Sequence, residues 1–484
     1  MEHAMKKKIR ILFLILFAGT AAVSLFGLQN NGTSREEDTA GRLSKLTEQT
    51  VDPAEWGKFF PLQYKDYLRT SERNGTKYGG GGSDAIALDL LAENPRLKIL
   101  FAGNAFSVDY RARRGHAYML SDQRETPRVK APFSQTGACL QCHSSNVAVY
   151  RNQGIADGAP GSSSESLTSQ NGYAQLFRGF EKVGKMPFEE ATKLVNHPLA
   201  CIDCHDPETM KLRVTRPAFI QGIRAFAASA ATASQFSSIE KWRVGDRTEP
   251  YDPNKTASNH EMRSFVCGQC HAEYYCGAEA TLFYPWNNGL KADEIESYYD
   301  TYKFPDGRTF SDWKHEESGA EVLKAQHPEF ELWSQGIHSR SAVSCADCHM
   351  PFRKEGESRV SDHWWRSPLL GEMETCRNCH LSTVEEVKAQ VEDVQERTNR
   401  MLRRAEDAVV ELIRAIASAR AIGYEDTQLR EAQQYQRGAQ WRVDFIRSEN
   451  SMGVHASGEA FRLLSEATDL ATRGRTAIYN LQLR

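Results

Sequence analysis

The sequence has almost no excess of charge of either sign. Its 484 residues include 60 lysines and arginines against 63 aspartates and glutamates, which gives a formal net charge of -3. Proteins that bind nucleic acid through its phosphates concentrate positive charge instead. The charge balance therefore predicts no nucleic acid partner.

Two other patterns are scarce or missing. The glycine run at 79–82 lacks the G-x-x-x-x-G-K-S/T spacing of a phosphate-binding loop, so it does not indicate a nucleotide site. Strand-length alternation of apolar and polar residues is also scarce, and short helical pieces joined by long loops are predicted instead. These features favour a mainly α fold.

Long apolar runs are limited to one, at the N-terminus. Four cationic residues between positions 6 and 10 precede an uncharged, mainly apolar run from Ile11 to Leu28. This order is typical of export, and it predicts a periplasmic location. The run is near the lower limit of about 17 to 25 residues for a spanning helix, so residues 1–29 are either a cleaved signal peptide or a retained N-terminal anchor. The polar residues 30–50 are predicted to be a linker.

Few cysteines fall outside one repeated pattern. Ten of the eleven belong to five copies of C-x-x-C-H, the attachment sequence of c-type haem. Two thiols attach one porphyrin, and the next residue places an imidazole under the iron. The five sets are Cys139, Cys142 and His143; Cys201, Cys204 and His205; Cys267, Cys270 and His271; Cys345, Cys348 and His349; and Cys376, Cys379 and His380.

The alternatives for this pattern are a redox C-x-x-C, structural zinc and disulfides. Five copies that all end in histidine disfavour each of them. The eleventh cysteine, Cys276, is interpreted as a buried, inert thiol.

Length alone favours about three domains, but five porphyrins would supply much of the core that apolar side chains otherwise build. Only 40% of the residues are hydrophobic. Residues 51–381 are therefore predicted to form one core around five haems, wrapped by helices and long loops; the resemblance given below implies that this core is catalytic.

The composition changes after the last motif. Residues 383–421 contain no glycine or proline and have apolar residues at helical spacing, which predicts a long helix. Further helices are predicted near 426–449 and 456–481. This region, 382–484, is expected to pack on the haem core, and its apolar stripe also favours contacts between two copies of the chain in a homodimer.

The histidine count leaves two readings open. Of fourteen histidines, five belong to the motifs and His3 lies in the N-terminal segment, which leaves eight. An electron carrier in which every iron has two imidazole ligands needs five of them. An enzyme with one open iron needs only four.

Two segments carry unusual polar neighbours. Glu273 and Tyr274 follow the third motif directly, and Lys324, Gln326 and His327 form a second group. The oxygens of Glu273 and Gln326 suit calcium, which prefers carboxylate and carbonyl ligands. Ordinary surface polar residues are the alternative for either segment.

Taken together, residues from about Trp56 to Leu481 resemble the pentahaem cytochrome c nitrite reductases, the ammonia-forming periplasmic enzymes. The resemblance is carried by the five motifs in order and by several short strings. These are R-G-H-A-Y at 114–118, C-G-Q-C-H-A-E-Y-Y at 267–275, K-A-Q-H at 324–327, G-I-H at 336–338, D-H at 362–363 and G-V-H at 453–455.

The resemblance implies a role for each matching residue. Arg128, Tyr274 and His327 would hold nitrite at the catalytic haem. Calcium would bind the side chains of Glu273 and Gln326 and the main-chain carbonyls of Tyr274 and Lys324. The distal iron ligands would be His116 for the third haem, His363 for the second, His455 for the fourth and His338 for the fifth.

The first motif departs from the commonest family pattern. Most well-known members have C-x-x-C-K there, with lysine as the proximal ligand, whereas this chain has His143. Some members resemble it in having C-x-x-C-H. The axial ligand helps to set the properties of iron, so the difference bears on rate and potential.

The implied activity is six-electron reduction of nitrite to ammonium at the first haem, which is left with an open site and is fed by four bis-histidine haems. The implied electron donor is a membrane-anchored multihaem quinol dehydrogenase. Two alternatives remain: another multihaem reductase, acting on hydroxylamine, sulfite or tetrathionate, and a multihaem electron carrier without catalysis.

Overall fold

Helices dominate the structure, a computed structural model that describes residues 45–72, 75–78, 87–112, 114–133, 135–371 and 373–483. Helix accounts for 56% of the structure and strand for 5%, which confirms the prediction of a mainly α fold. The predicted signal or anchor, most of the predicted linker and the glycine run at 79–82 lie outside the described residues.

Most of the helices before residue 382 are short. The helices are α2 (Pro53–Gly57), α3 (Pro61–Leu68), α4 (Leu90–Glu93), α5 (Arg96–Leu100), α6 (Met119–Glu125), α7 (Leu140–His143), α8 (Val147–Ala156), α9 (Gln170–Lys185), α10 (Phe188–Ala191), α11 (Pro217–Ala228), α12 (Ser237–Val244), α13 (Pro253–Thr256), α14 (Asn259–Gly268), α15 (Ala292–Thr301), α16 (Glu329–Gln335), α17 (Ile337–Arg340), α18 (Cys345–His349) and α19 (Glu374–Arg377). Two antiparallel hairpins pair β1 (Trp313–Lys314) with β2 (Glu321–Val322) and β3 (Phe352–Glu355) with β4 (Ser358–Ser361).

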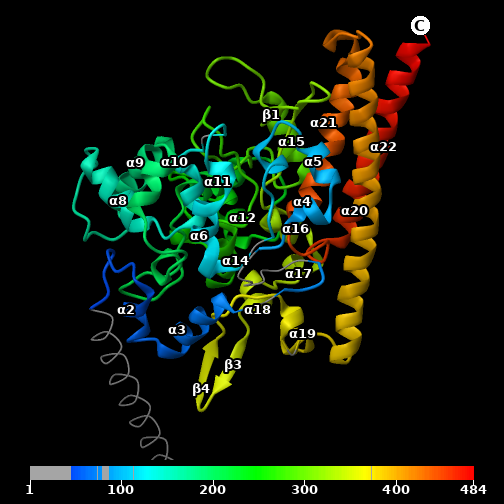
Figure 1. Cartoon of the computed structure of the whole chain (residues 1–484). Helices are drawn as coiled ribbons and strands as arrows, with labels where there is room; N and C mark the ends of the chain where they lie inside the picture. The colour runs from blue at the N-terminus through cyan, green and yellow to red at the C-terminus, as the bar shows by residue number, and fades with distance from the viewer. Residues whose placement is uncertain are drawn as a thin grey trace, which may run out of the picture.

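Three long helices form a layer along one side of the molecule: α20 (Val384–Ala421), α21 (Asp426–Ser448) and α22 (Ser457–Gln482) (Figure 1). Their bounds agree with the predicted helices to within one residue. Thr383 begins α20 with a capping box, in which its side chain accepts from the Glu386 N–H and the Glu386 side chain accepts from the Thr383 N–H. The apolar face of α20 is buried against α21 and α22.

A cluster of aromatic rings builds the core next to the third motif. Phe330 at the start of α16 packs against Phe265 of α14, Trp286 and Phe236, with ring centres 5.5 to 6.0 Å apart. The Phe330 N–H donates to the His271 carbonyl at 3.0 Å. This packing fixes the segment before Phe330, which contains His327, beside the third motif.

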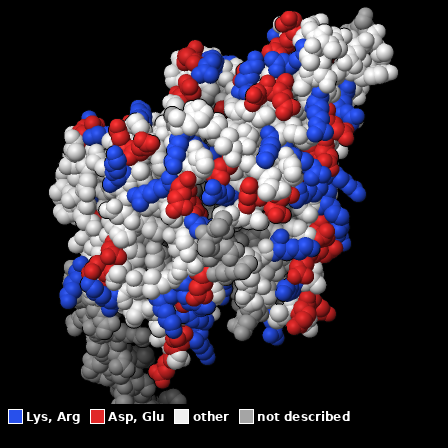
Figure 2. Space-filling view, in the orientation of Figure 1, with Lys and Arg blue, Asp and Glu red and all other residues white. Residues whose placement is uncertain are grey.

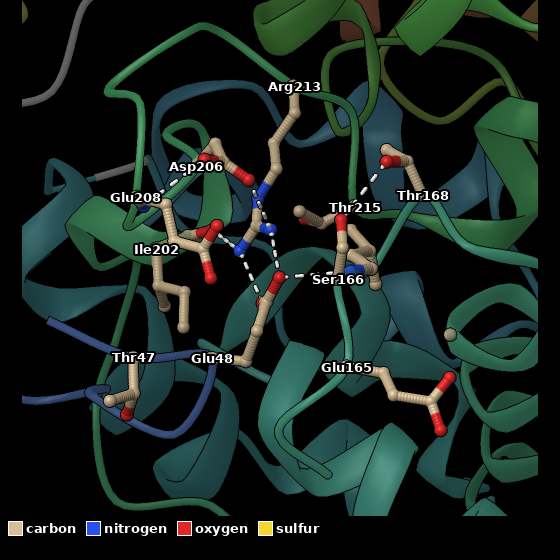
Figure 3. Close-up of polar contacts among 12 residues, drawn as sticks. Thr47, Glu48, Glu165, Ser166, Thr168, Ile202, Asp206, Glu208, Arg213 and Thr215 are labelled. Carbon is tan, nitrogen blue, oxygen red and sulfur yellow. Dashed lines mark hydrogen bonds and ion pairs between the residues drawn. The ribbon is translucent and has the colours of Figure 1, made fainter. Parts of the chain in front are cut away.

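The first described residues are held tightly although they belong to the predicted linker. Leu46 is buried, and the buried Glu48 carboxylate accepts from both terminal nitrogens of Arg213 at 2.7 and 2.8 Å and from the Leu167 N–H at 3.0 Å (Figure 3). Arg213 also lies beside Asp206, just after the second motif. Leu46 and Glu48, at the end of the predicted linker, are therefore part of the packed core.

Acidic and basic side chains are interspersed over the face of the molecule in Figure 2. None of the helices in the described ranges is long and apolar enough to cross a membrane.

Candidate functional site

All five C-x-x-C-H motifs lie on short helical turns. Cys139 ends a 3₁₀ turn that continues into α7, the second motif begins a 3₁₀ turn at Cys201, and the third ends α14. The fourth forms α18, and the fifth includes α19. None of the eleven cysteines, all of which lie in described segments, forms a disulfide.

The motifs open onto one connected cavity of about 1450 Å³. Its lining includes all ten motif cysteines, all five motif histidines and each of the histidines predicted to be a distal ligand. Side chains from segments far apart in the sequence thus enclose one space large enough to accept extended cofactors.

Four of the motif histidines have a second imidazole opposite them. An ion bound by two imidazoles at about 2 Å each, with about 1.2 Å more from nitrogen to ring centre, separates the ring centres by roughly 6.4 Å. The observed separations are 5.9 Å for His116 and His271, 6.3 Å for His363 and His205, 6.4 Å for His455 and His349, and 6.3 Å for His338 and His380. Each gap fits one iron.

Several of these rings are also oriented through their other nitrogen. In four histidines Nδ1 lies close to a main-chain carbonyl: that of Met119 for His143 (3.1 Å), Met210 for His205 (2.9 Å), Arg366 for His349 (2.9 Å) and Ser361 for His363 (3.0 Å). In His455, Nδ1 lies 2.6 Å from the Glu449 carboxylate. In the first four of these histidines a hydrogen bond at Nδ1 fixes the ring and leaves Nε2 for a metal, whereas the contact at His455 is an ion-pair contact. The residues present therefore fit haem iron.

His315 provides a contrast. It is buried, its Nε2 lies 2.8 Å from the Ile99 carbonyl, and its Nδ1 accepts from the Ser318 N–H at 3.3 Å. Both ring nitrogens are occupied by the backbone, so this histidine has a structural role. His260 is exposed on α14.

The third motif lies between the others. The Cys270 thiol lies close enough to Cys142 of the first motif to raise the pKa of Cys142, and Cys345 of the fourth motif raises the pKa of Cys267 in the same way. Gln269 lies with its amide nitrogen 4.0 Å from the sulfur of Cys204 in the second motif. A porphyrin attached to the third motif would therefore lie next to those attached to the first, second and fourth motifs.

The predicted nitrite-binding residues gather beside the first motif. The rings of Tyr274 and His327 have centres 6.3 Å apart. Arg128 lies close enough to Cys139 and Tyr274 for both to affect its pKa. Burial raises the pKa of Tyr274 well above its usual value, so its phenol stays protonated at neutral pH. All three side chains line the cavity.

Arg128, which is partly buried, differs from the fully buried arginines in its partners. Arg151 and Arg213 lie against Glu48 at 3.4 and 2.7 Å, and Arg216 pairs with Asp203 at 2.9 Å. Within the part of the chain that the structure describes, no carboxylate forms an ion pair with Arg128. Its Nε donates to the Thr126 hydroxyl at 3.2 Å, and its guanidinium stacks 4.2 Å from the centre of the Phe106 ring. A cation held in this way is available to an anion that enters the cavity.

The Arg216–Asp203 pair connects two motifs. Arg216 donates to the Ser144 carbonyl, just after the first motif, and to the Asn146 side chain, both at 2.8 Å. Asp203 lies inside the second motif, and both members of the pair are completely buried. This pair fixes the first two motifs relative to one another.

Replacement of Asp203 by alanine is expected to destabilise the protein by about 3 to 5 kcal/mol, because it leaves the buried Arg216 charge without a counter-ion. Denaturant unfolding measures the loss. Asp157→Ala is the matched control, since its pair with Arg178 is exposed and contributes little to stability. Equal losses in the two variants would contradict this account.

The side chains predicted to bind calcium also lie together. The Glu273 carboxylate is buried and accepts from the Gln326 N–H at 2.6 Å and from the Tyr299 hydroxyl at 3.1 Å. Gln326 lines the cavity beside His327. The described residues contain no group of three or more His, Cys, Asp or Glu side chains gathered around one point. The predicted set needs only one carboxylate, with amide and main-chain oxygens for the rest.

The surroundings of Glu273 hold more negative than positive charge. Glu331 and Asp444 are also buried, and the buried ammonium of Lys324 is 2.9 Å from Asp444. Burial raises the pKa of Glu273 well above its usual value and that of Glu331 to about 8. A divalent cation beside Glu273 would offset this cost, so the residues present fit calcium.

Cys276 lies in the same region. Its thiol lines the cavity close enough to Cys139 and Arg128 for their charges to act on it, and burial raises its pKa well above the usual value. It therefore remains a protonated thiol at neutral pH.

The sequence analysis did not identify the side chains that hold Arg128 in place. Thr126, Phe106 and Asp109 surround it, and none of them carries a recognisable motif. One local pattern is present: threonine followed by proline is typical of the start of a helical turn, and Thr126 caps the 3₁₀ turn Pro127–Val129.

One cavity that holds ten motif cysteines and paired imidazoles defines a multihaem c-type cytochrome. Residues 52–483 match the cytochrome c552 family, and the chain belongs to that family. Cytochrome c-552 of Parabacteroides distasonis is 32% identical over 96% of this chain and 85% of its own length. Cytochrome c-552 of Bacteroides fragilis is 33% identical over the same shares of both chains.

A solved structure has the same fold. Cytochrome c nitrite reductase from Desulfovibrio desulfuricans, described as a catalytic subunit, NrfA, with two calcium sites, gives a TM-score of 0.70 at 26% identity. The match covers 90% of this chain and 87% of that chain.

Proposed function

We propose that this protein reduces nitrite to ammonium at the haem of the first motif. The observation that carries the proposal is Arg128, a cation with no carboxylate ion pair among the described residues, beside Cys139, Tyr274 and His327. Nitrite takes up six electrons and eight protons to give ammonium and two waters. The site must therefore bind an anion and supply both electrons and protons.

Arg128 binds and orients the anion. Its Nε is directed to Thr126, so the two terminal nitrogens are left to donate to nitrite oxygens. Donors fixed before the reaction stabilise negative charge without reorganisation, which makes them effective in a buried site.

His327 and Tyr274 serve the proton steps. An imidazole changes its protonation state near neutral pH, so His327 can donate a proton to an oxygen that leaves as water. The protonated Tyr274 phenol donates a hydrogen bond and orients the substrate. Cys276, protonated and beside Arg128, adds no competing anion.

Five c-type haems supply the electrons and the open coordination position for nitrite. His205, His271, His349 and His380 each face a second imidazole, so four haems would be closed to substrate and would carry electrons. A haem held by Cys267 and Cys270 would lie next to those held by the first and fourth motifs, and it would be suited to pass electrons to the first.

Calcium at Glu273 and Gln326, with main-chain oxygens of Tyr274 and Lys324, would stiffen the site. Glu273 directly precedes Tyr274, and Gln326 directly precedes His327. Fixing these ligands fixes both neighbouring side chains, and the ion adds positive charge near the anion.

The protein would work in the periplasm as a homodimer, with a membrane-anchored multihaem quinol dehydrogenase as electron donor. Apolar side chains remain exposed at the far end of the three long helices, at Ile422, Tyr479 and Leu483, and beside the fifth motif at Leu381. These side chains would be covered by a second copy of the chain.

Substrate preference tests the proposal against other multihaem reductases. The purified protein, reduced by a dye donor without oxygen, should have a higher kcat/KM for nitrite than for sulfite, hydroxylamine or tetrathionate. Side activity on hydroxylamine and sulfite is compatible with a cationic pocket. A preference for one of these three substrates would assign the site to that reaction.

Replacement of His116 by alanine should raise the high-spin iron from one haem in five to two in five, because it removes the imidazole opposite His271. Magnetic circular dichroism of the oxidised protein measures the ratio. The control His260→Ala removes an exposed histidine and should leave the ratio unchanged. An unchanged ratio in the His116 variant would exclude that pairing, and wild-type protein with only low-spin iron would support the electron carrier.

A further inference from the structure

The guanidinium of Arg128 is fixed along one edge. Its Nε donates to the Thr126 hydroxyl oxygen at 3.2 Å, and its face lies 4.2 Å from the centre of the Phe106 ring. Stacking holds the plane of the guanidinium, and the hydrogen bond selects its rotation within that plane. Thr126 is two residues from Arg128 in the sequence, whereas Phe106 reaches it from a separate segment of the chain.

Asp109 sets the direction of the Thr126 hydroxyl. The Thr126 hydroxyl lies 2.6 Å from Oδ2 of the buried Asp109. An ionised carboxylate only accepts, so the single hydroxyl hydrogen must point toward Asp109. The lone pairs of the Thr126 oxygen are then free to face Arg128 and accept from its Nε. The carboxylate thus acts on Arg128 through one intervening hydroxyl.

Arg111 occupies the other oxygen of Asp109. Its Nε donates to Oδ1 at 2.7 Å, and this ion pair neutralises the carboxylate charge. Asp109 is therefore engaged on both oxygens. This explains how a buried carboxylate lies near Arg128 without forming the direct ion pair made by Arg151, Arg213 and Arg216.

We propose that Asp109, acting through the Thr126 hydroxyl, is the positioning residue of the anion-binding Arg128, and that Arg111 keeps Asp109 from competing with the substrate anion. The inference deepens the proposed function and rests on it. It assigns three residues, Asp109, Thr126 and Arg111, to the affinity of the site for nitrite. None of the three touches the substrate.

The first arm of the test removes the hydroxyl. Thr126→Val keeps the shape of the side chain but cannot accept from the Nε or the main-chain N–H of Arg128. Loss of the charge-assisted hydrogen bond from Nε is expected to raise the Kd and KM for nitrite about tenfold. Because the contact is made both before and during the reaction, kcat should change less than KM. Thr126→Ser retains the hydroxyl and should restore both constants to within about twofold.

The second arm frees the carboxylate. Arg111→Ala leaves Asp109 uncompensated and able to pair directly with Arg128, so the KM for nitrite should rise. Adding Asp109→Asn removes the competing charge but keeps a side-chain oxygen that can accept from the Thr126 hydroxyl, so the double variant should bind nitrite more tightly than Arg111→Ala alone. A purely structural role predicts the opposite order, because two substitutions disturb the packing more than one.

Nitrite binding is measured on the oxidised holoprotein by the optical change of the high-spin haem, alongside thermal unfolding and haem content. Wild-type affinity in Thr126→Val, equal defects in the valine and serine variants, or a double variant weaker than Arg111→Ala would each overturn the inference. Wild-type protein that binds nitrite but does not reduce it would contradict the proposed function while the binding series still tests the inference. Wild-type protein that does not bind nitrite would overturn both.

Discussion

Replacement of Arg128 by alanine is expected to lower kcat/KM for nitrite by about 10² to 10³-fold, the usual cost of removing one fixed donor from a site that stabilises an anion. Arg128 forms no carboxylate ion pair in the described ranges, so its removal should leave no buried carboxylate without a counter-ion. All five haems should therefore remain attached, and steady-state kinetics with a dye donor measures the loss.

The matched control for this substitution is Lys130→Ala. Lys130 is a cation two residues away in the sequence, but it is exposed and lies outside the cavity lining. Its removal changes net charge equally and should leave kcat/KM within about twofold, because exposed charges interact weakly across water. Wild-type turnover in Arg128→Ala, or the same loss in both variants, would exclude Arg128 as the anion-binding residue.

Replacement of His327 by alanine should lower kcat by about 10² to 10⁴-fold, which is the usual contribution of a general acid or base. Nitrite binding should change far less, since Arg128 remains. Single-turnover spectra of the reduced protein separate the two steps, because binding and reduction alter the haem absorption at different times.

His327→Asn serves as the comparison for this variant. Asparagine keeps a hydrogen-bond donor but does not titrate between pH 5 and 8, so nitrite should still bind while reduction stays slow. If either variant lost one haem or gained a second high-spin iron, His327 would be an axial ligand instead of a proton donor.

The features that the sequence predicted are those encoded locally. A C-x-x-C-H motif contains both attachment thiols and the iron ligand within five residues. The apolar periodicity of residues 383–421 can likewise be recognised without knowing which elements pack against them. The bounds of α20, α21 and α22 were predicted for that reason. The places of Arg128, Tyr274 and His327 followed from a family resemblance, and the structure brings them to one cavity.

The features that the sequence did not predict depend on pairing between distant residues or on the direction of a hydrogen bond. Glu48 lies in a polar stretch that predicted a linker, but its carboxylate is buried against Arg213, which is 165 residues away. Polarity alone cannot distinguish an exposed glutamate from a buried, paired one. Thr126 and Asp109 matter through the direction of one hydroxyl, which no residue pattern encodes.

The central claim, that this chain converts nitrite to ammonium, is tested most directly by product stoichiometry. Purified protein reduced by a dye donor without oxygen should form one ammonium for each nitrite consumed, with six electrons drawn from the donor. Accumulation of nitric oxide, or consumption of nitrite without ammonium, would contradict the account.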